Sequence, residues 1–164
     1  FYSVHGGFST NNVNEDPEVL VPLAALKEAE REGKIGKLDD YYYVTTGNLT
    51  ILKEARKMGR EIVEQLKMDG IQAAILVATL GSCTRCGATM VNEMEKSGIP
   101  TALITNMTAV ARSIGSPRVI PGIAINNPCS DIDLPMEEQL KMRRNYIDRA
   151  LKAVSAEVSG QEFF

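Results

Sequence analysis

A continuous apolar run, "IQAAILVAT", extends from Ile71 to Thr79 between Gly70 and Gly81. A run of this length that is bounded by glycines is typical of a strand covered on both faces, as in a parallel sheet. The run therefore predicts a central strand, and it places the residues after Thr79 at the carboxyl end of that strand. In open α/β sheets, ligands bind at this end of the strands.

Strand-like and helix-like segments alternate along the chain. Further strands are predicted at "YYYVTT" (Tyr41–Thr46), at "PTALIT" (Pro100–Thr105) and at "RVIPGIAI" (Arg118–Ile125), where Pro121 indicates an edge or a bulge. The spacing of apolar residues, with Gly and Pro at the ends, predicts helices at residues 17–33, 50–67, 84–97, 107–115 and from Pro135 onward. We expect a single α/β domain over residues 1–164, with a loop-rich lead-in at 1–16. Its fold is predicted to be layered and Rossmann-like, with a mostly parallel sheet of about four strands and helices on both faces.

Charge and cysteine count narrow the class of protein. A net charge of −3 argues against a nucleic-acid-binding surface or a polybasic membrane surface. No apolar run approaches the roughly 20 residues of a transmembrane helix, and the first residues lack the features of a signal peptide, so we expect a cytoplasmic location with reduced thiols. The chain begins with Phe1 rather than Met, which indicates a fragment or a processed subunit of a longer protein.

Cys83 and Cys86 form a CxxC pair where the apolar run ends and the next helix is predicted to begin. A structural zinc site needs about four ligands; the chain offers only His5 and Cys129 besides this pair, so no metal site is predicted. Two interpretations stay open: small side chains packed behind a loop, or a thiol-based nucleophile or redox pair. The start of a helix stabilises thiolate, and Arg85 adds positive charge, so we favour a reactive pair with Cys86 in the first helical turn.

Polar residues that follow the predicted strands are candidates for substrate binding. Thr45, Thr46 and Gly47 end the first predicted strand and offer hydroxyls and backbone N–H groups to a carboxylate. Asn106 follows a later strand on the same rim. His5 either binds a substrate carboxylate or moves a proton, or it only braces a turn before two glycines.

The stretch "GSCTRCGATMVNEMEKSGIP" (Gly81–Pro100) strongly resembles the active-site region of component B of glycine, sarcosine and betaine reductases. The D-proline reductase selenoprotein is similar more distantly. The resemblance continues in "HGGFSTNNVNEDPEVLVPL" near the start of the chain and in "SIGSPRVIPGIAI" towards its end. Glycine-type members are much longer, so the chain resembles their carboxyl-terminal portion.

The resemblance implies roles for the residues around the CxxC pair. The family motif is Sec-Gly-x-Cys-x-x-Cys, and on this chain Leu80 stands at the selenocysteine position, with Cys83 and Cys86 at the two cysteines. The helix start and loop of the motif comprise Gly81, Ser82, Thr84, Arg85 and Gly87.

The implied chemistry is reductive cleavage of the C–N bond of glycine, sarcosine, betaine or proline. The implied partners are a subunit that carries a pyruvoyl group, a small selenoprotein carrier (component A) and a thioredoxin-type reductant in a hetero-oligomeric complex. No cofactor is expected on this chain itself.

Leucine at position 80 has no nucleophilic atom. Three interpretations stay open: a paralogue whose nucleophile has moved to Cys83, a non-catalytic assembly or binding subunit, and a substitution for selenocysteine. The first and third leave Cys83 and Cys86 as the chemical groups at the strand end, while the second makes the chain a binding protein rather than an enzyme.

Overall fold

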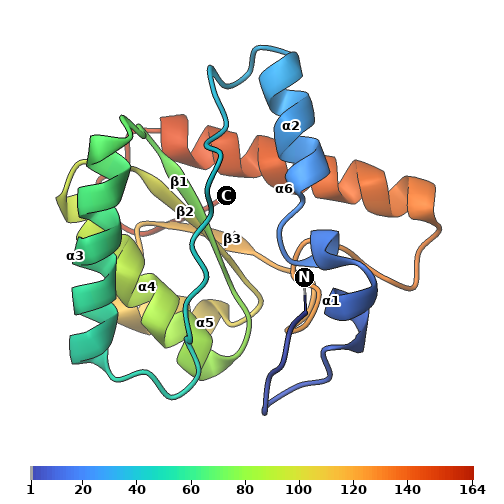
Figure 1. The fold of residues 1–164 in the computed structure, drawn as a ribbon, viewed down its shortest axis with the longest axis horizontal. Coiled ribbons are helices and arrows are strands. Elements are labelled where there is room, and N and C mark those ends of the chain that lie inside the picture. Colours follow the sequence, from blue (N-terminus) through green and yellow to red (C-terminus); the bar gives the residue numbers. More distant parts are fainter. Residues whose placement is uncertain (1) are drawn as a thin grey trace.

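A computed structural model describes residues 2–164 and contains one sheet of parallel strands (Figure 1). The strands are β1 (Ala74–Ala78), β2 (Thr101–Thr105), β3 (Arg118–Pro121) and β4 (Glu162–Phe163), hydrogen-bonded in the order β1-β2-β3-β4. In the register, Leu103 of β2 pairs with Leu76 on one side and with Val119 on the other. The predicted α/β class and the mostly parallel sheet of about four strands are therefore confirmed.

Helices cover both faces of the sheet, as the sequence predicts. They are α1 (Asn11–Glu15), α2 (Leu23–Arg31), α3 (Leu52–Met68), α4 (Gly81–Lys96), α5 (Thr108–Ile114) and α6 (Met136–Ser155), with a 3₁₀ turn η1 at Pro17–Val19. Helices α4 and α5 pack on one face, with α3 outside α4, and α6 packs on the other face with α2 against it (Figure 1).

Side chains alternate along the buried strand β2 and supply both halves of the core. Leu103 points to the face of α4 and α5, where it joins Val91 and Ala111. Ile104, its neighbour in sequence, points to the opposite face and packs with Tyr146 of α6. This two-residue period is what a strand covered on both sides requires.

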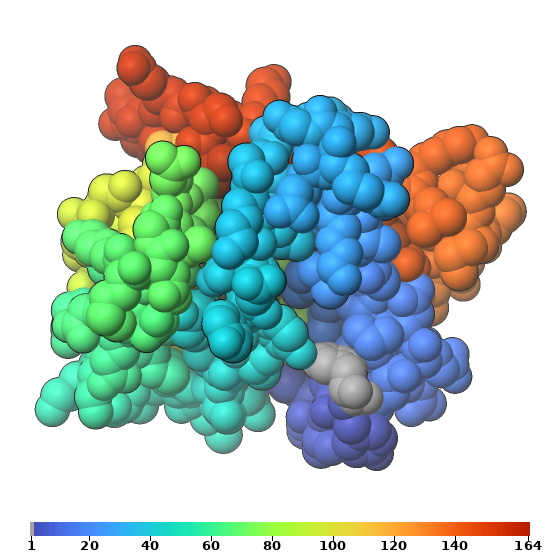
Figure 2. Space-filling model, turned by 45° about the horizontal axis from the view of Figure 1, so that its top comes forward, coloured from blue at the N-terminus to red at the C-terminus, as the bar shows by residue number. Residues whose placement is uncertain are grey.

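The segment Tyr41–Thr46 is not a strand, so that prediction is wrong. It belongs to an irregular strap, residues 38–50, which crosses the molecule in front of β1 in Figure 1 and lies at the surface beside α2 in Figure 2. Tyr41 is 76% exposed and Val44 is 77% exposed. Residues of this type favour strands because they pack on a half-buried pleated surface, and the strap lacks both the ladder and the burial.

Other boundaries also differ from the predictions. β1 lies at the edge of the sheet rather than at its centre, because the strap does not pair with it. The predicted helix 17–33 is divided into η1 and α2, and the lead-in contains the short helix α1. β3 ends at Pro121, whose missing N–H cannot continue a ladder, and the fourth strand is β4 near the carboxyl end.

Gly87 allows α4 to lie close to the sheet. A Cβ atom at this position would lie 2.8 Å from the Leu76 Cδ2 and 3.3 Å from the Ala78 Cβ, both on β1. Three residues earlier, the buried Thr84 hydroxyl forms a 2.8 Å hydrogen bond with the Thr105 hydroxyl at the end of β2. These two contacts position the first turns of α4 over the carboxyl ends of β1 and β2.

We expect Gly87→Val to lower the free energy of unfolding by about 1–3 kcal/mol, since overpacking at a close helix–strand contact forces the two elements apart. Arg56→Val, at an exposed position of the neighbouring helix α3, is the matched control and should change stability by no more than about 0.5 kcal/mol. Urea denaturation measures both. Equal midpoints for the two variants would contradict the packing role of Gly87.

Cys129 is a core residue between β3 and α6. Its thiol is fully buried in the cluster with Ile120 and Tyr146, and it donates a 3.1 Å hydrogen bond to the Leu20 carbonyl. Burial raises the pKa of the Cys129 thiol from 9.0 to about 12. This cysteine is therefore held as a neutral thiol in the folded protein.

The raised pKa predicts a loss of stability at alkaline pH. Between pH 9 and about 12 the unfolded chain releases the Cys129 proton while the folded chain retains it, so the free energy of unfolding falls by up to about 1.4 kcal/mol per pH unit. Urea denaturation from pH 8 to 11 should show a shallower fall for Cys129→Ala. Buried Cys86 and Tyr146, whose pKa values burial also raises, supply the slope that remains. An unchanged slope in the variant would contradict this assignment.

Candidate active site

The first turn of α4 lies directly after β1, at the carboxyl edge of the sheet. Leu80 is the N-cap residue, with extended backbone (φ −70°, ψ 172°), and its carbonyl accepts the Thr84 N–H at 2.7 Å. The N–H groups of Gly81, Ser82 and Cys83 have no acceptor within the helix. Together with the helix dipole they create a local positive potential in front of residue 80.

Cys83 is the third residue of α4 and is half-buried. Its Sγ lies 3.4 Å from the Nε2 of His5, which comes from the amino-terminal lead-in. The other ring nitrogen of His5, Nδ1, accepts the Gly7 N–H at 3.0 Å. The ring also stacks on Phe8, with the centroids 4.4 Å apart. The structure thus brings His5 and Cys83, both predicted site residues, into direct contact.

The strap contributes the third side of this site. A Cβ atom on Gly47 would lie 3.1 Å from the Cys83 Cα and 3.5 Å from its Sγ, so the strap backbone touches the cysteine. Next to it, the Ser82 hydroxyl donates a 3.1 Å hydrogen bond to the Asn48 Oδ1. The Arg85 guanidinium donates a 3.4 Å hydrogen bond to the Thr50 carbonyl.

Of the other strap residues predicted for the site, Thr45 and Thr46 serve the turn itself. The Thr45 carbonyl accepts the Gly47 N–H at 3.1 Å, and the Thr46 carbonyl accepts the Thr50 hydroxyl. The strap therefore meets the start of α4 through an irregular turn and not at the end of a strand.

Cys86 has a different environment from Cys83. Because α4 begins at Gly81 rather than at Thr84, Cys86 lies in the second helical turn and not in the first, which corrects the prediction. It is buried between α3 and α4 against Ala55 and Met90. Burial raises the pKa of the Cys86 thiol. Cys86 is thus a packed, neutral thiol, contrary to the expectation of a thiolate pair.

The remaining predicted residues hold the scaffold. Thr84 and Gly87 fix α4 on the sheet, as described above. The Asn106 amide donates to the Ile123 carbonyl at 2.9 Å and to the Gly122 carbonyl at 3.4 Å, so it holds the loop after β3. The rim after β2 reaches the site through the next residue, Met107, whose Cε would lie 3.6 Å from a Cβ on Gly81.

Gly7, Phe8 and Met107 also lie at this site, although the sequence pattern does not predict them. A Cβ atom on Gly7 would overlap the Leu80 Cδ1 and would lie 3.3 Å from the His5 Nδ1, so the backbone at Gly7 covers residue 80. The signal was present in "HGGF", where an aromatic side chain follows a histidine and two glycines. Spacing alone did not show that these residues reach a segment more than seventy positions away.

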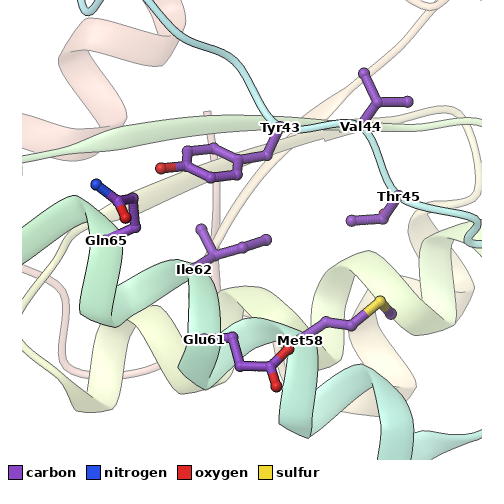
Figure 3. A pocket seen from close by; sticks show the side chains of 7 residues that line it. All are labelled: Tyr43, Val44, Thr45, Met58, Glu61, Ile62 and Gln65. Carbon is purple, nitrogen blue, oxygen red and sulfur yellow. The ribbon is translucent and has the colours of Figure 1, made fainter.

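Thr45 also lines a shallow surface hollow of about 360 Å³ between the strap and α3. In Figure 3, strap residues line the hollow on one side and residues of α3 line it on the other. The strap contributes Tyr43, Val44 and Thr45, and α3 contributes Met58, Glu61, Ile62 and Gln65. Neither Leu80 nor Cys83 borders this hollow. Within residues 2–164, no group of three or more His, Cys, Asp or Glu side chains is placed to hold a metal ion.

Comparison with known proteins identifies the family. The family model for glycine/sarcosine/betaine reductase selenoprotein B matches residues 1–79. Over 164 residues the chain is 43% identical to a glycine reductase complex component B subunit gamma of Carboxydothermus hydrogenoformans and 41% identical to a betaine reductase complex component B subunit beta of Peptoclostridium acidaminophilum. The chain belongs to the component B family of these reductases.

The alignments with these two relatives cover the whole chain but less than half of the length of each relative. All 164 residues align with 38% of the length of each of these two proteins. A D-proline reductase subunit gamma of Acetoanaerobium sticklandii is 32% identical over 117 residues, which are 71% of this chain and 48% of that protein. No solved structure matches the component B chain. Across residues 2–164, none of its helices is long and apolar enough to cross a membrane.

Gly47 offers a test of the contact between strap and helix in this component B chain. We expect Gly47→Val to lower the free energy of unfolding by about 1–3 kcal/mol, because the new side chain meets the backbone of Cys83, which cannot move aside as a side chain can. Gly36→Val is the matched control, since a Cβ atom there has no neighbour within 4 Å. Urea denaturation of both variants measures the difference, and equal stabilities would contradict the contact.

Proposed function

We propose that this chain forms the nucleophile-bearing part of component B in a reductive, C–N-cleaving amino-acid or betaine reductase. The single observation that carries the proposal is the place of residue 80, which is the N-cap of α4 at the carboxyl end of β1. A selenolate or thiolate at that position faces the N–H groups of the first helical turn, which stabilise an anion.

The reaction assigned to this site is a displacement at carbon. An anionic nucleophile at residue 80 attacks the α-carbon of a small amine, the C–N bond breaks, and the amine leaves with the bonding electron pair. A pyruvoyl group on a partner subunit supplies the carbonyl that activates the amine in glycine- and proline-type substrates. The small selenoprotein carrier (component A) then takes up the carbon fragment, which releases the residue-80 nucleophile as an anion. A thioredoxin-type reductant supplies the two electrons for the reductive release of the fragment from the carrier.

Within this proposal, the two cysteines of the motif have separate roles. Cys83 is one helical turn from residue 80, is only half-buried, and lies between the lead-in and the strap. This position suits Cys83 to thiol exchange with the nucleophile. Cys86 is buried between α3 and α4 and serves packing. The turn Thr45–Gly47 is our candidate for holding the substrate carboxylate, because Gly47 touches Cys83.

One observation favours a second function. The Leu80 side chain lies against the Gly7 backbone, so an apolar group occupies the place of the nucleophile and is covered there. A component B subunit of this kind would present the loop without performing the displacement. This alternative is a non-catalytic assembly or binding subunit of the same reductase family.

Substitution at position 80 separates the two functions. In the full-length protein, supplied with its partner subunits and a dithiol, we expect the Leu80 form to be at least about 100-fold less active than Leu80→Sec. Cys83 is displaced from the line of attack, and a misplacement of roughly 1 Å already costs about 100-fold. Leu80→Cys should be intermediate, since thiols ionise less at neutral pH. The assay is substrate-dependent formation of acetyl phosphate or of the reduced amino acid.

Leu80→Ser is the control, because serine restores a polar side chain but no ionised nucleophile. If the Leu80 form matches the turnover of Leu80→Sec, the nucleophile lies elsewhere. If neither form turns over any of the four substrates, the non-catalytic function is favoured. A UGA codon at position 80 of the coding DNA would show that selenocysteine is the native residue.

A further inference from the structure

The ring of His5 is held in one tautomer by its own neighbour. Nδ1 accepts the Gly7 backbone N–H at 3.0 Å, and a backbone N–H is always a donor. In the neutral imidazole the proton therefore resides on Nε2. Nε2 is the nitrogen that lies 3.4 Å from the Cys83 Sγ.

We propose that His5 is a fixed hydrogen-bond donor that stabilises Cys83 as a thiolate. This differs from both functional roles that the sequence suggests for the histidine, because in this tautomer Nε2 cannot accept the Cys83 proton and its N–H is directed at the Cys83 sulfur. Only the role of this thiolate in the reaction depends on the proposed function. The hydrogen bond itself follows from the positions of Gly7, His5 and Cys83.

Several contacts of the lead-in keep the ring in place. Phe8 stacks on the imidazole at 4.4 Å with an interplanar angle of 24°. Upstream, the Ser3 N–H donates to the Asn14 Oδ1 at 2.6 Å, and the Asn14 amide donates to the Ser3 carbonyl at 3.0 Å. Asn14 thus anchors the lead-in two residues before His5, and the Gly7 N–H fixes the rotation of the ring.

Few other charged groups surround the sulfur. The lead-in carries no titratable side chain besides His5 between Ser3 and Thr10, and the strap carries none between Val44 and Thr50. On α4 itself the nearby groups are Arg85, whose guanidinium donates to the strap, and the buried thiol of Cys86. Because few charged groups are near, the effect of removing the His5 donor on the reactivity of Cys83 should not be masked by other charges.

The rate of alkylation of Cys83 tests the proposal and does not depend on reductase activity. The chain is treated with iodoacetamide and the label at each cysteine is measured by mass spectrometry. At pH 7 we expect His5→Phe, which retains an aromatic ring to stack on Phe8, to react about 10-fold more slowly than the unchanged protein, since hydrogen bonds to charged groups are strong. At pH 10, where the thiol ionises without help, the two rates should converge.

Two controls exclude a purely structural effect. His5→Gln, which still offers an N–H donor at a similar reach, should retain most of the rate at pH 7. The buried Cys129 should remain unlabelled in every variant, which shows that the fold is intact. The proposal is overturned if His5→Phe reacts as fast as the unchanged protein at pH 7, if its rate falls by the same factor at both pH values, or if His5→Gln is as slow as His5→Phe.

Discussion

Helix α4 lies directly on β1 at Gly87, where any side chain would meet Leu76 and Ala78. This contact and the hydrogen bond between the Thr84 and Thr105 hydroxyls determine how close the first turns of α4 lie to the sheet. Because the first turn follows β1 almost at once, the same contacts position its unpaired N–H groups. The lead-in and the strap then pack over a helix end whose position is already determined.

Cys83 and Cys86 lie in different environments in this arrangement, although they are only three residues apart. A helix makes one turn in 3.6 residues, so residues three apart are neighbours on its surface but are offset by about 60° around the helix axis. Cys83 faces the lead-in, where His5 offers it a polar hydrogen, while Cys86 enters the apolar layer between α3 and α4. The same motif therefore supplies one accessible sulfur and one packing group, and the sequence spacing alone does not distinguish them.

The apolar run before Gly81 and the amphipathic helices made the layered α/β fold predictable from the sequence. The strap was not, because "YYYVTT" has the composition of a strand while its burial depends on partners that no local pattern encodes. The two-residue strand β4 carries no periodicity at all. The family resemblance made Leu80 and Cys83 candidates for the site. The start of α4 at Gly81 was not predicted, because glycine is a poor helix former.

The contact between His5 and Cys83 joins residues 78 positions apart. Closing a loop of that length costs conformational entropy. The contacts that the lead-in makes when it docks on the folded sheet offset this cost. A chain that has formed only β1, α4 and β2 therefore carries an ordinary cysteine. The environment of this sulfur therefore depends on whether the lead-in, 78 positions away, has docked on the sheet.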